Sequence, residues 1–282
     1  MEKYEIPPSA ILIGNGVMGK RHLARLQNHN LVFNAVLDSE TELREFWEAE
    51  GHNISPGVAI IASPATTHFT YAHFFLDQGW SVFVEKPLAT CSEEAKILVT
   101  KARTHDLPLF VGHSERYHPA LAHFPSQFRE VFVAGRVTHM ETHRENLFSE
   151  RAHDVNVTFD ILVHDLDLIF YTLGSTIAPT VKVMNAHADF DSVSAELSFT
   201  NGVTASLYAN RNATHTERTL AAIGPNTVLK VDLAQNNLFP NDALEREYEA
   251  LFATLQNAKH NREALQSALL AVQTAEAINS LC

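Results

Sequence analysis

The sequence predicts an α/β protein: a doubly wound parallel sheet followed by an α+β domain with a mostly antiparallel open sheet. Three observations predict this. A Gly-rich turn at residues 14–19 joins an apolar run to a helical pattern. Short apolar runs then alternate with helical patterns up to about residue 115, as in sheets with helices on both faces. Beyond that point, runs of period-2 alternation follow one another, separated by turn signals such as Asn201-Gly202.

The first part, residues 1–115, is predicted to form the parallel-sheet domain. Its strands are expected in the apolar runs at 10–13, 31–37, 57–62, 81–84 and 108–111. Its helices are expected where apolar residues recur at helical spacing, at 19–28, 41–49, 68–78 and 92–104. Only one helix fits between Asp38 and the strand at residue 57, so we expect a trimmed sheet there.

The second part, residues 116–282, is predicted to begin with a long strand at 131–144 and a helix at 155–173. Four alternating runs indicate an antiparallel meander with helices on one face, and they lie at 180–189, 192–200, 202–212 and 216–223. A final helix at about 261–280 is expected to pack back on one of the two domains, the first being a candidate. The uncovered sheet face is expected to expose apolar side chains, with candidates Val181, Val183, Leu197, Phe199, Leu207 and Tyr208. An exposed apolar face usually marks a contact surface, so we expect a homodimer or homotetramer.

Composition excludes several classes of protein. The net charge of −12 over 282 residues argues against nucleic-acid and anionic-membrane partners. No apolar run reaches the roughly 20 residues that span a bilayer, and the first residues lack the features of a signal peptide. Two cysteines are too few for a disulfide framework. We therefore expect a cytoplasmic protein.

The Gly-rich turn is the most informative stretch. Gly14, Gly16 and Gly19 fit a strand that turns tightly into a helix, where unpaired backbone N–H groups and the helix dipole bind a pyrophosphate. Asp38 follows nineteen positions later, where a carboxylate accepts hydrogen bonds from the adenosine ribose hydroxyls and repels the 2′-phosphate of NADP. The pattern predicts a Rossmann domain that binds NAD rather than NADP. Two further turn residues are assigned to the cofactor site, Val17 and Met18.

Two loops follow predicted strands at the edge of the sheet where ligands of parallel sheets bind. The loop that begins Ser63-Pro64 and ends at His68 is expected to line the cofactor crevice, although alone it reads equally as a helix start. In the loop Glu85-Lys86-Pro87, a fixed ammonium on Lys86 could stabilise a developing alkoxide. Glu85 and Lys86 could instead form a surface ion pair. We assign Ser63, Pro64, His68, Glu85 and Lys86 to the cofactor site.

The predicted helix at 155–173 carries Asp160 and His164 at spacing i, i+4, so both emerge on one face. A carboxylate beside an imidazole fixes its tautomer and raises its basicity, which suits a general base. A structural polar pair and a divalent metal site are the alternatives. Among sixteen histidines we find no ligand spacing that supports a metal, and none is predicted.

With these motifs the chain resembles the Gfo/Idh/MocA family of NAD(P)-dependent sugar oxidoreductases over about residues 8–280. The resemblance rests on the glycine turn followed by His22, the loop from Ser63 to His68, Glu85-Lys86-Pro87 and the helix with Asp160 and His164. It implies that Lys86, Asp160 and His164 serve the catalytic site, that the histidine takes the proton of a sugar hydroxyl, and that the open sheet forms the subunit contact. The segments 111–119 and 164–168 look most like a subgroup that acts on UDP-N-acetylhexosamines at C3.

We therefore expect an NAD-dependent dehydrogenase that oxidises a secondary hydroxyl of a sugar or nucleotide sugar. The substrate-binding candidates are Lys86, Arg116, Tyr117 and His164. A guanidinium at Arg116 could grip a phosphate or carboxylate, or it could be a solvated surface charge. One alternative is an inactive cofactor-binding regulator or structural subunit of the same fold. A metal-dependent hydrolase is another, but it leaves the glycine turn unexplained.

Overall fold

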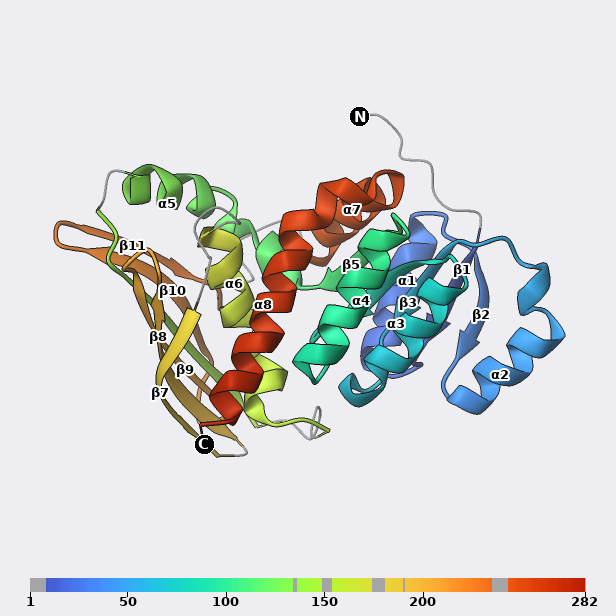
Figure 1. Ribbon diagram of the computed structural model, residues 1–282, viewed down its shortest axis with the longest axis horizontal. Coiled ribbons are helices and arrows are strands. Elements are labelled where there is room, and N and C mark those ends of the chain that lie inside the picture. The colour runs from blue at the N-terminus through green and yellow to red at the C-terminus, as the bar shows by residue number, and fades with distance from the viewer. Residues whose placement is uncertain are drawn as a thin grey trace. The chain divides into compact units, whose positions relative to one another are not determined.

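The computed structural model describes residues 9–133, 136–148, 154–173, 181–189, 191–234 and 243–281. The chain divides into two compact units, and each is described by itself (Figure 1). The first unit holds the described residues of 9–89, 93–112 and 248–265, and the second unit holds the others. The chain passes from the first unit to the second after Gly112, three residues before the boundary expected at residue 115. The later segment Tyr248–Leu265 belongs to the first unit.

The first unit contains a five-stranded parallel sheet in the order β2-β1-β3-β4-β5. Its strands are β1 Ala10–Ile13, β2 Phe33–Leu37, β3 Val58–Ile61, β4 Ser81–Glu85 and β5 Leu109–Gly112. The helices between them are α1 Val17–Asn28, α2 Glu40–Ala49, α3 His68–Asp77 and α4 Ser92–Thr104. The predicted doubly wound sheet is confirmed.

The burial of the strands follows from this topology. Every residue of the central strands β1 and β3 is buried, as expected for parallel strands covered on both faces. Burial alternates along the edge strand β2, but the other edge strand, β5, is buried throughout, and the Asn261 side-chain amide donates to its Leu109 carbonyl oxygen at 2.8 Å. Because right-handed crossovers leave β1 and β3 in opposite directions, α1 covers one face while α3 and α4 lie side by side on the other (Figure 1). The strand order reverses between β1 and β3, and in open parallel sheets ligands generally bind at the carboxyl ends of the strands at such a reversal.

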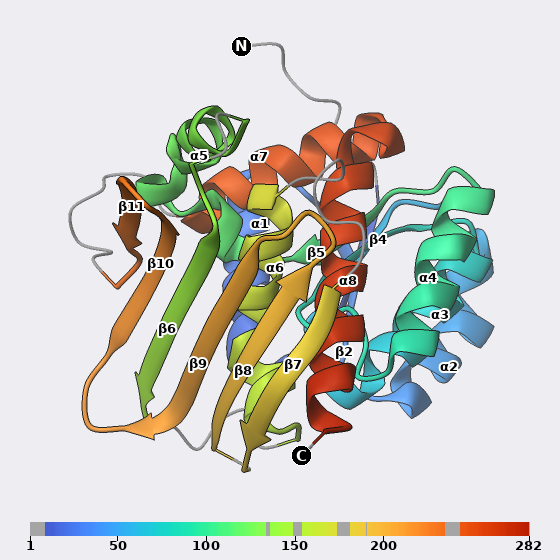
Figure 2. The same cartoon turned by 60° about the vertical axis from the view of Figure 1, so that its left-hand side comes forward.

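The second unit contains a six-stranded sheet in the order β11-β10-β6-β9-β8-β7, with its strands side by side in Figure 2. The strands are β6 His139–Leu147, β7 Val181–Ala188, β8 Ser192–Phe199, β9 Thr204–Ala213, β10 Glu217–Gly224 and β11 Thr227–Asp232. β6 and β9 are parallel and the other neighbours are antiparallel. The predicted mostly antiparallel sheet is confirmed.

The helices of the second half are α5 Phe124–Val133, α6 Val163–Leu173, α7 Ala243–Gln256 and α8 Arg262–Asn279. A π-helical turn, Thr158–Leu162, leads into α6. α6 lies against the face of the six-stranded sheet that we call the inner face (Figures 1 and 2). The last part of α8, from Gln266, belongs to this unit.

Several predicted elements of the second half are wrong in detail. The start of the predicted strand at 131–144 is the end of α5, and β6 begins only at His139. The simple meander is wrong because β6 inserts between β9 and β10. β11 and α7 were not predicted. β11 has no clear alternation of apolar and polar residues, whereas α7 carries a helical pattern that went unrecognised, made by Leu244, Tyr248, Leu251, Phe252 and Leu255.

The prediction of an apolar uncovered sheet face is also wrong. Leu197, Phe199 and Leu207 are buried on the inner face. The opposite, outer face presents polar side chains such as Ser206, together with Tyr208, whose ring packs on His143 with centroids 4.9 Å apart. The side chains of Val181 and Val183 lie outside the described part of the structure. A shift of one residue in strand phase exchanges the two faces, which explains the error.

Among the helices within the described ranges, none is both long and apolar enough to cross a membrane.

Candidate functional site

The β1–α1 turn of the first unit has the geometry of a phosphate cradle. Gly14 has φ +96°, and a Cβ there would lie 2.5 Å from the Ala62 carbonyl oxygen at the end of β3. A Cβ on Gly19 would lie 1.8 Å from the Gly14 carbonyl oxygen, so helix and strand pack too closely for any side chain. Among the described residues other than its chain neighbours, none has an atom within 4 Å of the Cβ position of Gly16, and Val17 is half exposed. The turn residues Asn15, Gly16 and Val17 are exposed, and the open space at Gly16 before the start of α1 suits a dinucleotide pyrophosphate.

Asp38 lies directly beside this turn. Its Oδ1 accepts a hydrogen bond from the Asn15 backbone N–H at 2.8 Å. Its own backbone N–H donates to Glu42 Oε2 at 2.7 Å, while Ser39 Oγ, the N-cap of α2, accepts from Glu42 N–H at 3.2 Å. Asp38 is therefore not the helix cap, and its side chain is exposed beside the turn, directly after β2.

His68 ties the two loops that follow β3 and β4. Its Nδ1 lies 2.7 Å from the Pro87 carbonyl oxygen and its Nε2 lies 3.0 Å from the Ser63 carbonyl oxygen. Burial of the ring lowers the pKa of His68, although both carbonyl contacts oppose that shift. The two loops assigned to the cofactor site are thus joined through one buried side chain. The peptide bond between Lys86 and Pro87 is cis.

Glu85 is held by a buried hydrogen-bond chain. Its Oε1 lies 2.8 Å from His22 Nε2, and His22 Nδ1 lies 3.0 Å from the Tyr248 hydroxyl. Its Oε2 accepts from the Lys86 backbone N–H at 3.2 Å. Burial alone would raise the pKa of Glu85, but its hydrogen bond to His22 and the charge of Lys86 outweigh burial and lower it. Tyr248 was missed because it lies 226 residues from His22 with no local signal.

The second predicted cluster lies on the π turn and α6 of the second unit. From Val157 to Phe170 every residue is buried except His164, which is half-buried. The His164 ring lies edge-on to the His113 ring with centroids 6.3 Å apart. His164 is therefore the point at which this buried segment reaches the surface.

Each aspartate of this segment pairs with an arginine from a different element. Asp160 Oδ2 accepts from Arg211 Nη1 of β9 at 3.1 Å. Asp165 Oδ1 accepts from Arg144 Nη2 of β6 at 2.8 Å, and Arg144 Nη1 also reaches Glu115 Oε1 at 3.0 Å. Burial would lower the pKa of Arg144, but Asp165 and Glu115 outweigh burial and raise it.

The third pair changes the expected role of Arg116. Its Nε donates to Asp167 Oδ2 at 2.6 Å and its Nη2 donates to Oδ1, a bidentate geometry, and its side chain is 3% exposed. The guanidinium also lies 5.2 Å from the centroid of the Tyr171 ring. The expected direct substrate contact is therefore corrected: a buried, paired guanidinium holds α6 instead. Tyr117 beside it is half-buried, and burial raises its pKa, so the phenol stays neutral.

Sequence reasoning missed Arg144 and Arg211, although a signal existed. Arg211 follows Ala205, Leu207 and Ala209 at every second position of β9, so it occupies the buried phase of the strand. A charged residue in that phase needs a buried partner.

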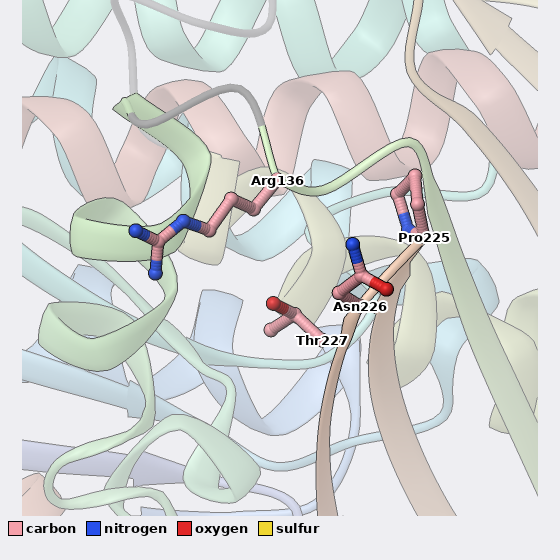
Figure 3. A pocket seen from close by; sticks show the side chains of 4 residues that line it. All are labelled: Arg136, Pro225, Asn226 and Thr227. Carbon is pink, nitrogen blue, oxygen red and sulfur yellow. The ribbon is translucent and has the colours of Figure 1, made fainter.

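Two further observations concern possible metal sites and surface hollows. Within the described residues, no group of three or more His, Cys, Asp and Glu side chains could hold a metal ion. A surface hollow of about 410 Å³ lies at the β10–β11 turn and is lined by Arg136, Pro225, Asn226 and Thr227 (Figure 3). Gly224 lets the chain pass there, since its Cβ would lie 1.5 Å from the Arg136 carbonyl oxygen. None of the predicted site residues lines this hollow.

Comparison with known proteins gives one consistent family. Residues 9–113 match the model of the oxidoreductase family with an NAD-binding Rossmann fold, and residues 123–229 match the GFO/IDH/MocA C-terminal domain. The chain is 27% identical to the UDP-N-acetylglucosamine 3-dehydrogenase of Acidithiobacillus ferrooxidans over 80% of this chain and 74% of that one. It is 24% identical to the scyllo-inositol 2-dehydrogenase (NAD(+)) of Bacillus subtilis over 60% of this chain and 54% of that one.

Solved structures share the fold. The structure of the Acidithiobacillus enzyme matches with a TM-score of 0.70 at 24% identity, covering 97% of this chain and 99% of that one. GenD2 from gentamicin A biosynthesis, solved in complex with NAD, matches with a TM-score of 0.80 at 17% identity, covering 99% and 95%.

Proposed function

The chain belongs to the GFO/IDH/MocA oxidoreductase family, and we propose that it is an NAD-dependent dehydrogenase that oxidises a secondary hydroxyl of a sugar or nucleotide sugar. The observation that carries the proposal is the position of His164, a half-buried imidazole in a segment whose other side chains are buried. Such an imidazole is reachable by a substrate and held by its surroundings, as a general base must be.

The cofactor is assigned to the first unit. NAD, when bound, supplies the acceptor for the hydride. The residues that would hold it lie on the turn and on the loops at the carboxyl ends of the strands: Gly14, Gly16, Val17, Met18, Gly19, Asp38, Ser63, Pro64, His68, Glu85 and Lys86. The cradle at Gly16 and the carboxylate of Asp38 support this assignment. Because Glu40 and Glu42 add negative charge beside Asp38, we propose a preference for NAD over NADP.

The catalytic roles fall to three residues. His164 accepts the proton of the substrate hydroxyl as the carbon that bears this hydroxyl gives up its hydride. The Lys86 ammonium stabilises the negative charge that develops on the oxygen. Asp160, in the π-helical turn before His164, orients the His164 imidazole. Tyr117, as a neutral phenol, remains the candidate for a hydrogen bond to the substrate.

The substrate class is tested by a screen. The named relatives act on UDP-N-acetylglucosamine and on inositols, so the panel contains UDP-N-acetylhexosamines, other nucleotide sugars and inositols. We expect NADH absorbance to appear with at least one member of the panel. A protein that binds NAD but oxidises none of them would support the alternative, an inactive cofactor-binding subunit.

The role of His164 is tested by His164→Ala. Turnover should fall by a factor on the order of 10²–10⁴, the usual contribution of a positioned general base, while the Kd for NAD stays the same. His105→Ala, at an exposed position after α4, is the matched control and should keep full turnover. Full activity of His164→Ala would remove this residue from the mechanism.

We also propose a homodimer or homotetramer in which the outer sheet face forms the contact. Because that face is polar, the proposal rests on the family resemblance and not on exposed apolar area. Light scattering should give two or four times the chain mass of 31.4 kDa. Ser206→Arg on the outer face should lower that mass, and Thr100→Arg on the exposed side of α4 should not. A wild-type mass near that of one chain would defeat the proposal.

A further inference from the structure

Arg211 binds both sides of the turn that carries Asp160. Its Nη1 donates to the Val155 carbonyl oxygen at 3.0 Å and to Asp160 Oδ2 at 3.1 Å. Its Nε donates to Asp191 Oδ1 at 3.0 Å, so the same guanidinium is anchored on the loop before β8. The side chain is 6% exposed. One buried group therefore connects β9, the loop before β8 and the entrance of α6.

The turn that Arg211 holds is a π-helical turn. The Val163 N–H bonds to the Thr158 carbonyl oxygen five residues back, where an α-helix bonds four residues back. Such turns are rare, occur mostly as single turns within α-helices and are frequent at functional sites. The extra residue rotates Asp160 relative to α6 and therefore relative to His164. Since Nη1 contacts Val155 before the turn and Asp160 within it, Arg211 stabilises this rotated arrangement.

The same contact decides the charge that His164 experiences. A carboxylate one turn away favours the protonated imidazole, which cannot accept a proton. The Arg211 guanidinium compensates part of the negative charge of Asp160, and it also pairs with Asp191, whose carboxylate is more exposed to water. Among the described residues, the His113 ring lies edge-on to the His164 ring, and the two carboxylates that follow His164 on α6, Asp165 and Asp167, each pair with an arginine.

We propose that Arg211 is a positioning residue of the proton-accepting site: it fixes the π turn and compensates Asp160, so that His164 stays neutral near neutral pH. The proposal rests on the proposed function for its catalytic meaning, but its physical content, the titration of His164, can be measured without turnover.

The test is an NMR titration of the histidine rings in the full chain, with the His164 signal assigned from His164→Ala. Arg211→Met removes one positive charge from beside Asp160 and should raise the His164 midpoint by about one pH unit, at the low end of the shift expected from a nearby opposite charge. Asp160→Asn removes a negative charge near His164 while Arg211 stays paired with Asp191, so it should lower the midpoint. The double variant should titrate near the wild-type value.

Two comparisons separate this role from general stability. Arg211→Lys keeps the positive charge but loses the planar, forked set of N–H donors of the guanidinium, so the His164 midpoint should stay near the wild-type value. Arg144→Met breaks the pair with Asp165, whose side chain does not share a helix face with His164, so it should destabilise the fold with a smaller shift. An unchanged His164 midpoint in Arg211→Met, or equal shifts in Arg211→Met and Arg144→Met, would overturn the proposal. If Arg211→Met does not fold, Asp160→Asn and Arg211→Lys still decide: an unchanged midpoint in Asp160→Asn overturns it.

Activity provides the second arm. On any substrate found in the screen, the acid limb of the kcat/KM profile should move to higher pH in Arg211→Met and return in Arg211→Lys. A loss of turnover with no movement of the limb would also overturn the proposal. A wild-type protein that oxidises nothing in the panel contradicts the proposed function, and the titration then still decides the role of Arg211.

Discussion

Asp38 holds the glycine turn and lies at the start of an acidic stretch of the chain. One carboxylate oxygen holds the glycine turn through the Asn15 N–H, and the group stands beside Glu40 and Glu42 at the start of α2. The local charge is therefore more negative than a single ribose-binding carboxylate would make it. A 2′-phosphate placed there meets repulsion from all three groups.

Asp38→Ala should weaken NAD binding and narrow its advantage over NADP. A hydrogen bond to a charged group contributes about 1.5–3 kcal/mol, so the NAD Kd should rise on the order of tenfold to a hundredfold. Titration with both cofactors checks this. Glu45→Ala, at an exposed position further along α2, is the control and should change neither Kd. A wild-type preference for NADP would show that the role of Asp38 is wrong.

The β1–α1 turn shows how one short element serves two purposes. Gly19 is required by the fold, because its Cβ would overlap the Gly14 carbonyl oxygen at 1.8 Å. Gly16 is not required by the fold, because its Cβ would meet no protein atom within 4 Å. The two positions of this motif therefore favour glycine for different physical reasons: close packing at Gly19 and open space for a ligand at Gly16.

Alanine substitution should separate these reasons. Gly19→Ala forces β1 and α1 apart and should lower the free energy of unfolding by about 1–3 kcal/mol, the usual cost of overpacking. Gly16→Ala should leave the free energy of unfolding nearly unchanged and weaken NAD binding at least roughly tenfold, because its methyl group fills the phosphate space. Urea unfolding and NAD titration measure the two effects. Wild-type NAD affinity in Gly16→Ala would contradict the assigned cradle.

At the scale of the whole molecule, the stability of the fold should depend on pH through His68. Its pKa is lowered by burial, so between its folded value and the ordinary 6.5 the unfolded chain binds a proton that the folded chain does not. The contribution of neutral His68 to the free energy of unfolding is therefore complete above pH 6.5, and it is lost as the pH falls towards the pKa of the folded state.

This predicts that the free energy of unfolding falls below about pH 6.5, by at most about 1.4 kcal/mol per pH unit for this residue. Urea unfolding from about pH 8 to about pH 5.5 measures the slope. His68→Gln carries no titrating ring and should show a smaller slope, although its free energy of unfolding is lower throughout because one carbonyl contact is lost. Identical slopes in both proteins would exclude His68 as the source.

The sequence by itself determined the features that local chemistry enforces. The glycine turn, the apolar runs of the parallel strands and the i, i+4 spacing of Asp160 and His164 depend on residues close together in the chain. The predicted strand Ala10–Ile13 and helix Ser92–Thr104 agree with the structure at both ends. Chain order and backbone sterics suffice for such elements.

Only the tertiary structure decided which distant residues meet. Tyr248 reaches His22, Arg211 reaches Asp160 and Arg116 pairs with Asp167, none of which a local pattern indicates. The strand phase that buries Leu197 and Leu207 was likewise decided by packing against the inner face. The physical reason is that buried charges and sheet faces are satisfied by partners across the fold, and those partners are set by three-dimensional packing, not by sequence separation.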